Sequence, residues 1–212
     1  MSQETKTPPA SFLRRSLSRL ARGPGFLLVL LLAVTLGLRL YGAGWDQGGL
    51  YHPDERQLLM TAAGLDLPSS LEQFLDPKAS PLNPHFFAYG SLPMYALEAA
   101  SGLLERVRNA AAGLDEKAVL GRVLSAIADT ATVLLLFLLG RRLYNERIAL
   151  LGAMLTAFMV VHIQLSHFFT VDVALTALVL ATLYFSVRLM QEGRLRDGLL
   201  AGLFLGLAVA TK

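Results

Sequence analysis

Five long apolar stretches dominate this sequence and limit the folds that it can adopt. A helix needs about 20 residues to cross the hydrocarbon core of a bilayer, and the stretches approach or reach that length. Only 17% of the residues are charged and 54% are hydrophobic, whereas soluble domains carry about 25% charge. We therefore expect an all-α polytopic membrane protein with about five transmembrane helices. The stretches are residues 25–42, 119–139, 148–165, 173–190 and 199–212.

Basic residues flank these stretches in a pattern that predicts topology. If the helices alternate, three basic groups share one side, which the positive-inside rule makes cytoplasmic. The loop at about 43–118 then lies outside, and it carries ten acids against five bases. The basic excess therefore marks helix ends, and nothing in the sequence favours a nucleic-acid partner. The three groups are Lys6, Arg14, Arg15, Arg19 and Arg22 in a cytoplasmic N-terminus at 1–23, then Arg141, Arg142 and Arg147, then Arg188, Arg194 and Arg196.

Both ends of the chain allow a second interpretation. The first stretch could be a cleaved signal peptide with a small-residue site at Gly42-Ala43-Gly44, although its apolar run is longer than usual and Arg39 interrupts it. The last stretch has about 14 residues, too few to cross a bilayer comfortably. We therefore expect that residues 24–212 are the N-terminal part of a larger, truncated membrane module.

The long outer loop reads as an ordered segment. Helix signals begin at His52-Pro53-Asp54-Glu55, because proline and acids suit a first helical turn. A second helix is expected from Ser91-Leu92-Pro93, with apolar and charged faces typical of a juxtamembrane helix. Residues 66–84 read as connecting loop, and the aromatic segment 83–90 suits the headgroup level. The absence of cysteine excludes a disulfide scaffold, a Cys-based zinc site and thiol catalysis.

Several polar residues lie where lipid is expected. Charges inside a membrane helix usually face a cavity or a partner, although a stripe that only packs against another helix explains them as well. A purely structural explanation is available for two further residues. Asp172 could simply cap its helix, and Lys212 could simply extend its ammonium from the apolar helix to the membrane surface. The stripe in the second apolar stretch consists of Arg122, Ser125, Asp129 and Thr132.

Seven titratable side chains map together to the outer face. Two carboxylates at an apolar boundary could act as a general base or as metal ligands, and cations could hold a phosphate. No fixed metal-ligand spacing appears, so a divalent metal stays an open alternative, and no other cofactor is indicated. The sequence has no Walker or dinucleotide-binding glycine motif. The seven residues are His52, Asp54, Glu55, His85, Arg122, His167 and Asp172.

In motif order, the chain resembles the N-terminal part of GT-C fold glycosyltransferases of the protein O-mannosyltransferase and lipid-A aminoarabinose transferase superfamily. Its Asp54-Glu55 pair resembles the family's Asp-Glu motif, and residues 83–95 resemble its proline-containing segment. Arg122 with the exit at 141–144 and the Ser166–Asp172 spacing resemble two further features. The glycine-rich end at 202–212 also resembles the family's helix ending in Thr-Lys. His167 stands where the family often has Arg, and the proline segment lacks the common lysine.

The resemblance implies a reaction and residue roles. A sugar would pass, with inversion, from a polyprenyl-phosphate donor to a hydroxyl or amine of a protein, lipid or glycan acceptor at the outer membrane face. Asp54 would be the base, Glu55 would orient either Asp54 or the acceptor, and Arg122 and Lys212 would bind the donor phosphate. His52, His85, His167 and Asp172 would support the site. The compact loops suggest a prokaryotic inner (plasma) membrane.

The alternative from another class is a non-catalytic membrane protein, a transporter or an assembly subunit. It would use the stripe from Arg122 to Asp129 as a polar path. A transporter would be expected to show inverted repeats and broken helices near the midplane. The sequence has no convincing internal repeat, and its acids concentrate in the outer loop.

Overall fold

The structure, a computed structural model, describes residues 24–212, and the regular secondary structure in that range is all helical. The basic N-terminus that the topology argument uses lies outside the described residues. The helices are α2 (Pro24–Leu40), α3 (Pro53–Ala62), α4 (Leu71–Leu75), α5 (Leu92–Arg108), α6 (Leu114–Leu143), α7 (Glu146–Ala157), α8 (Val160–Ser166), α9 (Val171–Glu192) and α10 (Leu195–Val209).

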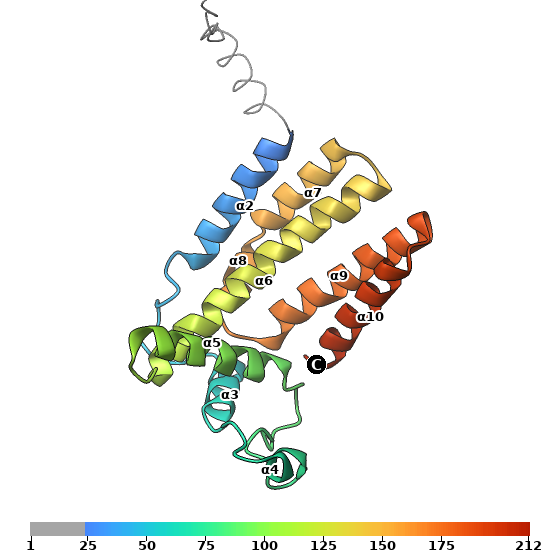
Figure 1. Cartoon of the computed structure of the whole chain (residues 1–212). Helices are drawn as coiled ribbons and strands as arrows, with labels where there is room; N and C mark the ends of the chain where they lie inside the picture. Colours follow the sequence, from blue (N-terminus) through green and yellow to red (C-terminus); the bar gives the residue numbers. More distant parts are fainter. Residues whose placement is uncertain (1–23) are drawn as a thin grey trace, which may run out of the picture.

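The apolar helices form a bundle with the long loop gathered at one end. Figure 1 shows α2, α6, α7, α9 and α10 side by side, with α3, α4 and α5 beyond one end of them. The short links after α6 and after α9 lie at the opposite end. This arrangement follows the alternation expected from the sequence, with the basic links away from the acidic loop.

The predicted number of spans is only partly reproduced among residues 24–212. Helices α6 and α9 are long and apolar enough to cross a membrane. Helices α7 and α8 make a third candidate if they count as one span, because a bend of 57° separates them. Helices α2 and α10 are apolar but have only 17 and 15 residues. The chain is therefore an integral membrane protein with two or three candidate spans, and the five predicted spans are not confirmed.

Small residues bring the bundle helices close together. Ala149, Ala153 and Ala157 repeat every fourth residue on α7 and are buried against α6. A Cβ atom on Gly140 of α6 would lie 3.1 Å from the Cα atom of Ala149. Membrane helices associate largely through such close packing, since lipid offers no hydrophobic contrast to drive them together.

The outer loop has its own core, which joins it to the bundle. The predicted helix starts at Pro53 and Leu92 are both confirmed. The segment predicted to be a connecting loop contains the short helix α4, because the Ser70 hydroxyl accepts the backbone N–H of Gln73 and caps it. Helix α5 lies across the end of the bundle (Figure 1). The core consists of Leu50, Leu58, Leu59, Ala62, Met94, Leu97, Ala118, Phe169 and Val171.

Candidate functional site

Arg122 lies at the centre of a buried ionic network at the outer end of α6. Its Nε and Nη2 atoms each donate to one oxygen of Glu55, both at 2.8 Å. Its Nη1 and Nη2 atoms donate to the two oxygens of Asp46 at 2.7 and 2.6 Å. Nη1 also donates to the carbonyl oxygen of Ala43 at 2.8 Å. Arg122 is 1% exposed and Glu55 is 0% exposed.

These contacts use all of the hydrogen-bonding capacity of the guanidinium. An arginine has five N–H donors, and each of them is bonded to an oxygen atom of Glu55, Asp46 or Ala43. A phosphate would have to displace Asp46 or Glu55 to reach Arg122. In this geometry Arg122 fastens the loop to α6, and its expected phosphate contact stays a prediction.

Glu55 is likewise held away from solvent. Besides the two bonds to Arg122, its Oε1 atom accepts the backbone N–H of Phe169 at 2.9 Å. Phe169 lies in the turn between α8 and α9, so Glu55 links the start of α3 to that turn as well as to α6. Its carboxylate can orient neighbouring elements, but it does not face an open site.

Asp46 is a member of the network that the sequence analysis did not single out. Hydrogen bonding from Arg122, assisted by backbone N–H groups of Leu50 and Gly48, lowers the pKa of Asp46 to about 2. A single acid in a loop of ten acids carries no sequence signal of its own. Only the folded position beside Arg122 distinguishes it.

A second group of polar residues is accessible, and Tyr89 lies at its centre. Lys212 Nζ donates to Asp172 Oδ1 at 2.7 Å, and these two side chains are 46% and 52% exposed. The same ammonium lies 5.9 Å from the centroid of the Tyr89 ring. Asp54 is partly exposed on the first turn of α3, within hydrogen-bonding reach of the Tyr89 hydroxyl. We call Asp54, Tyr89, Asp172 and Lys212 the Tyr89 cluster.

The charges in the Tyr89 cluster influence one another. Burial, followed by the nearby Asp54 carboxylate, raises the pKa of Tyr89. The hydrogen bond to Asp172 raises the pKa of Lys212, so the ammonium stays charged. The structure thus brings Asp54, Asp172 and Lys212 together around a tyrosine that was interpreted only as a headgroup-level aromatic residue.

Two backbone hydrogen bonds fix the end of α10 beside this cluster. The N–H groups of Gly90 and Leu92 donate to the carbonyl oxygens of Thr211 and Ala210, both at 3.1 Å. A Cβ atom on Gly90 would lie 2.0 Å from the Ala210 oxygen. Glycine at position 90 therefore permits the contact that carries Lys212 to Tyr89.

A pocket of about 830 Å³ opens next to Tyr89 and Lys212. Its other walls include Phe74 and Phe87, and its polar residues include Asp76. Ligand sites of this size are mostly apolar with a few placed polar groups. Asp54 and Asp172 do not line the pocket. Asp172 is linked to it through the ion pair with Lys212.

The three predicted histidines do not join the Tyr89 cluster. The ring of His52 lies 4.7 Å from that of Phe168. The two ring nitrogens of His167 contact the carbonyl oxygens of Ile163 and Tyr41 at 2.7 and 2.8 Å. His85 is exposed in a turn with a φ angle of 49°. Among residues 24–212, no three His, Asp or Glu side chains are grouped as metal ligands.

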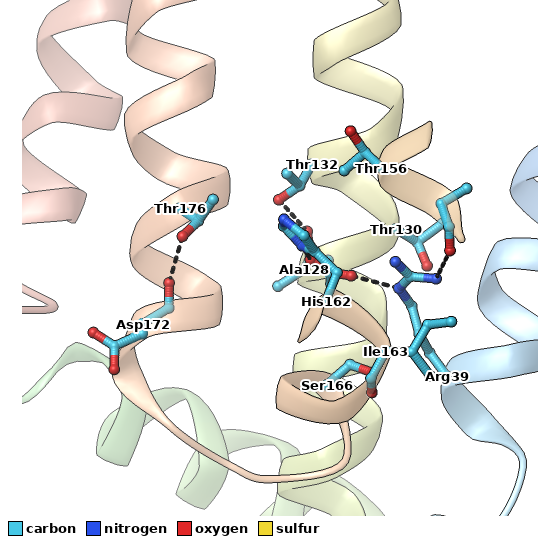
Figure 2. A network of polar contacts seen from close by, with 12 residues as sticks. Arg39, Ala128, Thr130, Thr132, Thr156, His162, Ile163, Ser166, Asp172 and Thr176 are labelled. Atoms are coloured by element: carbon cyan, nitrogen blue, oxygen red, sulfur yellow. Dashed lines mark hydrogen bonds and ion pairs between the residues drawn. The ribbon is translucent and has the colours of Figure 1, made fainter. Parts of the chain in front are cut away.

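A third polar network lies within the bundle, away from the Tyr89 cluster. Arg39 of α2 and His162 of α8 approach α6 from two sides, while Asp172 lies apart on α9 (Figure 2). Arg39 and His162 both bind Asp129 of α6. His162 Nδ1 lies 2.6 Å from Oδ1, and Arg39 Nε is paired with Oδ2. Asp129 therefore has its own partners, and the stripe from Arg122 to Asp129 is divided between two separate networks.

Arg39 also stabilises the break between α7 and α8. Its Nη1 atom donates to the carbonyl oxygen of Ala157, the last residue of α7, at 3.1 Å. A broken helix at membrane depth leaves backbone groups that must find protein partners. The sequence showed that Arg39 interrupts an apolar run, but it could not show which groups Arg39 binds.

Comparison with known proteins gives one match. Residues 112–212 match the sequence model of a family described as dolichyl-phosphate-mannose-protein mannosyltransferase. This confirms, for just under half of the chain, the resemblance to GT-C mannosyltransferases. The match includes Arg122, Asp172 and Lys212, but the Asp54-Glu55 pair lies outside it. No curated protein and no solved structure matches the chain.

Proposed function

We propose that the protein transfers a sugar from a polyprenyl-phosphate donor to an acceptor hydroxyl at the outer membrane face. The family match supports a glycosyltransferase with a lipid-linked donor. The observation that carries the site assignment is the accessible Tyr89 cluster, which combines a carboxylate with an ammonium beside a pocket. Such a transfer needs a base for the acceptor and a cation for the leaving phosphate.

Asp54 is the proposed base. Within residues 24–212 it forms no ion pair, whereas its neighbour Glu55 is fully engaged with Arg122. The acceptor oxygen would attack the anomeric carbon, and its proton would pass to Asp54. The bond from that carbon to the phosphate oxygen would break, so the configuration would invert and the electron pair would leave with polyprenyl phosphate.

Lys212 is the proposed phosphate ligand, and Arg122 is not. The Lys212 ammonium is nearly half exposed and has only Asp172 as an ion-pair partner within the described residues. It can therefore turn to a phosphate oxygen without uncovering a buried charge. Arg122 and Glu55 would act indirectly, by holding α3 and hence Asp54 in place.

The pocket beside Lys212 gives the proposal a location for the reacting groups. Its volume of about 830 Å³ is within the usual range for small-molecule sites. Phe74 and Phe87 could pack against apolar parts of the acceptor. The lipid tail of the donor would remain in the bilayer beside the apolar helices.

The test uses membranes that contain the full-length protein and a polyprenyl-phosphate mannose donor labelled in the sugar. Asp54→Asn should lower kcat at least about 100-fold, since general bases contribute 10²–10⁴-fold. The control is Asp66→Asn, an exposed acid of the same loop that hydrogen-bonds to the backbone N–H of Leu67. If the Asp54→Asn and Asp66→Asn variants transferred sugar equally well, the proposed base would be wrong.

The polar-path alternative makes a different demand. It requires one continuous route from Arg122 to Asp129, but each of these residues has its own partners. Two results together would favour that alternative: the full-length protein transfers sugar from none of the donors tested, and it conducts ions when reconstituted in vesicles.

A further inference from the structure

Tyr89 is held firmly enough to position other groups. Its ring packs edge-on against Phe86, with the centroids 5.8 Å apart, and borders the core of the outer loop. The next residue, Gly90, is bonded through its N–H to Thr211. The ring is therefore fixed from both sides, by the loop core and by the end of α10.

The face of the ring and the hydroxyl contact different charged groups. Lys212 Nζ lies 5.9 Å from the ring centroid, within the range for attraction between a cation and an aromatic face. The hydroxyl lies near the carboxylate of Asp54, on the first turn of α3, close enough for that carboxylate to help raise the pKa of Tyr89. Tyr89 thus lies between a carboxylate and an ammonium that are far apart in the sequence, at positions 54 and 212.

We propose that Tyr89 is a positioning residue with two separable functions, the hydroxyl orienting Asp54 and the ring face holding the Lys212 ammonium. This inference rests on the proposed function, because it assigns to Tyr89 the placement of the base and of the phosphate ligand. The phenol keeps its proton throughout. It donates to one oxygen of Asp54, and the other oxygen is left to accept the proton of the acceptor hydroxyl.

The ring function follows from the exposure of Lys212. A long, half-exposed lysine samples many conformations, and an aromatic face together with Asp172 limits them.

Two variants separate the two functions. Tyr89→Phe keeps the ring and removes only the hydroxyl, so kcat should fall about 10-fold while the KM for the donor changes less than about twofold. Tyr89→Leu removes the ring as well, and it should also raise the KM for the donor about 3- to 30-fold. The control is Tyr51→Phe, a loop tyrosine that is 70% exposed and whose ring lies beside Trp45.

A third comparison tests the link to Asp54 directly. If the hydroxyl acts through that carboxylate, adding Tyr89→Phe to Asp54→Asn should change the residual kcat less than about twofold, because the two effects are not additive. Each variant is measured in the same membranes with labelled polyprenyl-phosphate mannose. Thermal denaturation in detergent, followed by the fluorescence of Trp45, the single tryptophan, shows whether each variant is folded.

The outcomes distinguish this inference from the proposed function. If Asp54→Asn abolishes transfer but Tyr89→Phe and Tyr89→Leu behave like wild type, Tyr89 only packs and the inference is wrong. It is also wrong if both variants lower kcat and stability to the same extent, with no change in KM specific to Tyr89→Leu. If Asp54→Asn retains full activity, the proposed function itself fails, whatever Tyr89 does.

Discussion

Glu55 and Arg122 meet in two parallel hydrogen bonds, each of 2.8 Å, although 67 positions separate them in the sequence. The contact gives adjacent acids different roles. Glu55 is buried against α6, while Asp54, one residue earlier on the same helical turn, is partly exposed and close enough to Tyr89 to help raise its pKa. A paired acidic motif can therefore supply one buried structural carboxylate and one carboxylate that stays partly exposed.

Removing the central cation should destabilise the protein strongly. Arg122→Met leaves Asp46 and Glu55 buried without a counter-ion, and breaking a buried pair in this way costs about 3–5 kcal/mol. Trp45 reports the loss, because its ring lies 5.8 Å from the Arg122 guanidinium. The measurement is unfolding in detergent followed by Trp45 fluorescence.

The control for Arg122→Met is Arg108→Met. Arg108 also forms an ion pair, with Glu116, but both partners are nearly half exposed. Exposed pairs contribute little to stability, so this variant should unfold almost like wild type. Equal losses in the two variants would mean that the Arg122 network is not a structural centre.

Acid should weaken the same network in a defined range. The pKa of Asp46 is about 2 in the folded protein, below the ordinary 3.8. A group whose pKa is lowered by folding stabilises the folded state above its unfolded pKa and loses that contribution as the pH falls. Asp46 should thus contribute about 2 kcal/mol above pH 4, lost between about pH 4 and pH 2.

The Asp46 contribution is measured as the change in unfolding free energy with pH, again through Trp45. Asp46→Asn should be less stable than wild type at pH 6 and should show a smaller loss on going from pH 4 to pH 2. A variant with the same acid sensitivity as wild type would assign that sensitivity to other carboxylates.

Local patterns in the sequence predicted elements and faces, but not partners. Pro53 and Ser91-Leu92-Pro93 marked helix starts because proline fits the first turn whatever surrounds it. The spacing of Arg122 and Asp129 placed both on one face of α6, and this spacing could not show that a loop covers one and two helices cover the other. Asp46 lies 76 positions from Arg122 in the sequence, and Arg39 lies 90 positions from Asp129.

The bend between α7 and α8 shows the same limit. The sequence around Ala157-Phe158-Met159 has neither proline nor glycine, so the pattern predicted one continuous span. The break depends on a tertiary contact, the bond from Arg39 to the freed carbonyl of Ala157. Tyr89 was missed for a related reason, since an aromatic residue at the headgroup level needs no specific role.

Asp129 should be more costly to remove alone than together with Arg39. Asp129→Leu leaves the fully buried Arg39 without its carboxylate, whereas the double variant Arg39→Leu with Asp129→Leu removes both charges. Replacing a whole buried pair by apolar residues is often neutral or stabilising. The double variant should therefore unfold at a higher temperature in detergent than Asp129→Leu, and the reverse order would mean that Arg39 has other sufficient partners.

Gly90→Ala should detach the end of α10 from the outer loop. The added Cβ atom would lie 2.0 Å from the Ala210 carbonyl oxygen. A Cβ atom and a carbonyl oxygen are both fixed by the backbone, so no side-chain rotation relieves the clash. The amides of Gly90 and Leu92 then lose their acceptors, and Lys212 moves from Tyr89. We expect faster hydrogen exchange at residues 90–92 and a KM for the donor raised at least about fivefold.

Gly102→Ala is the matched control, because nothing lies within 4 Å of its added Cβ and alanine favours the α5 helix. If Gly90→Ala and Gly102→Ala gave the same exchange rates and the same KM, the contact between Gly90 and α10 would have no part in placing Lys212.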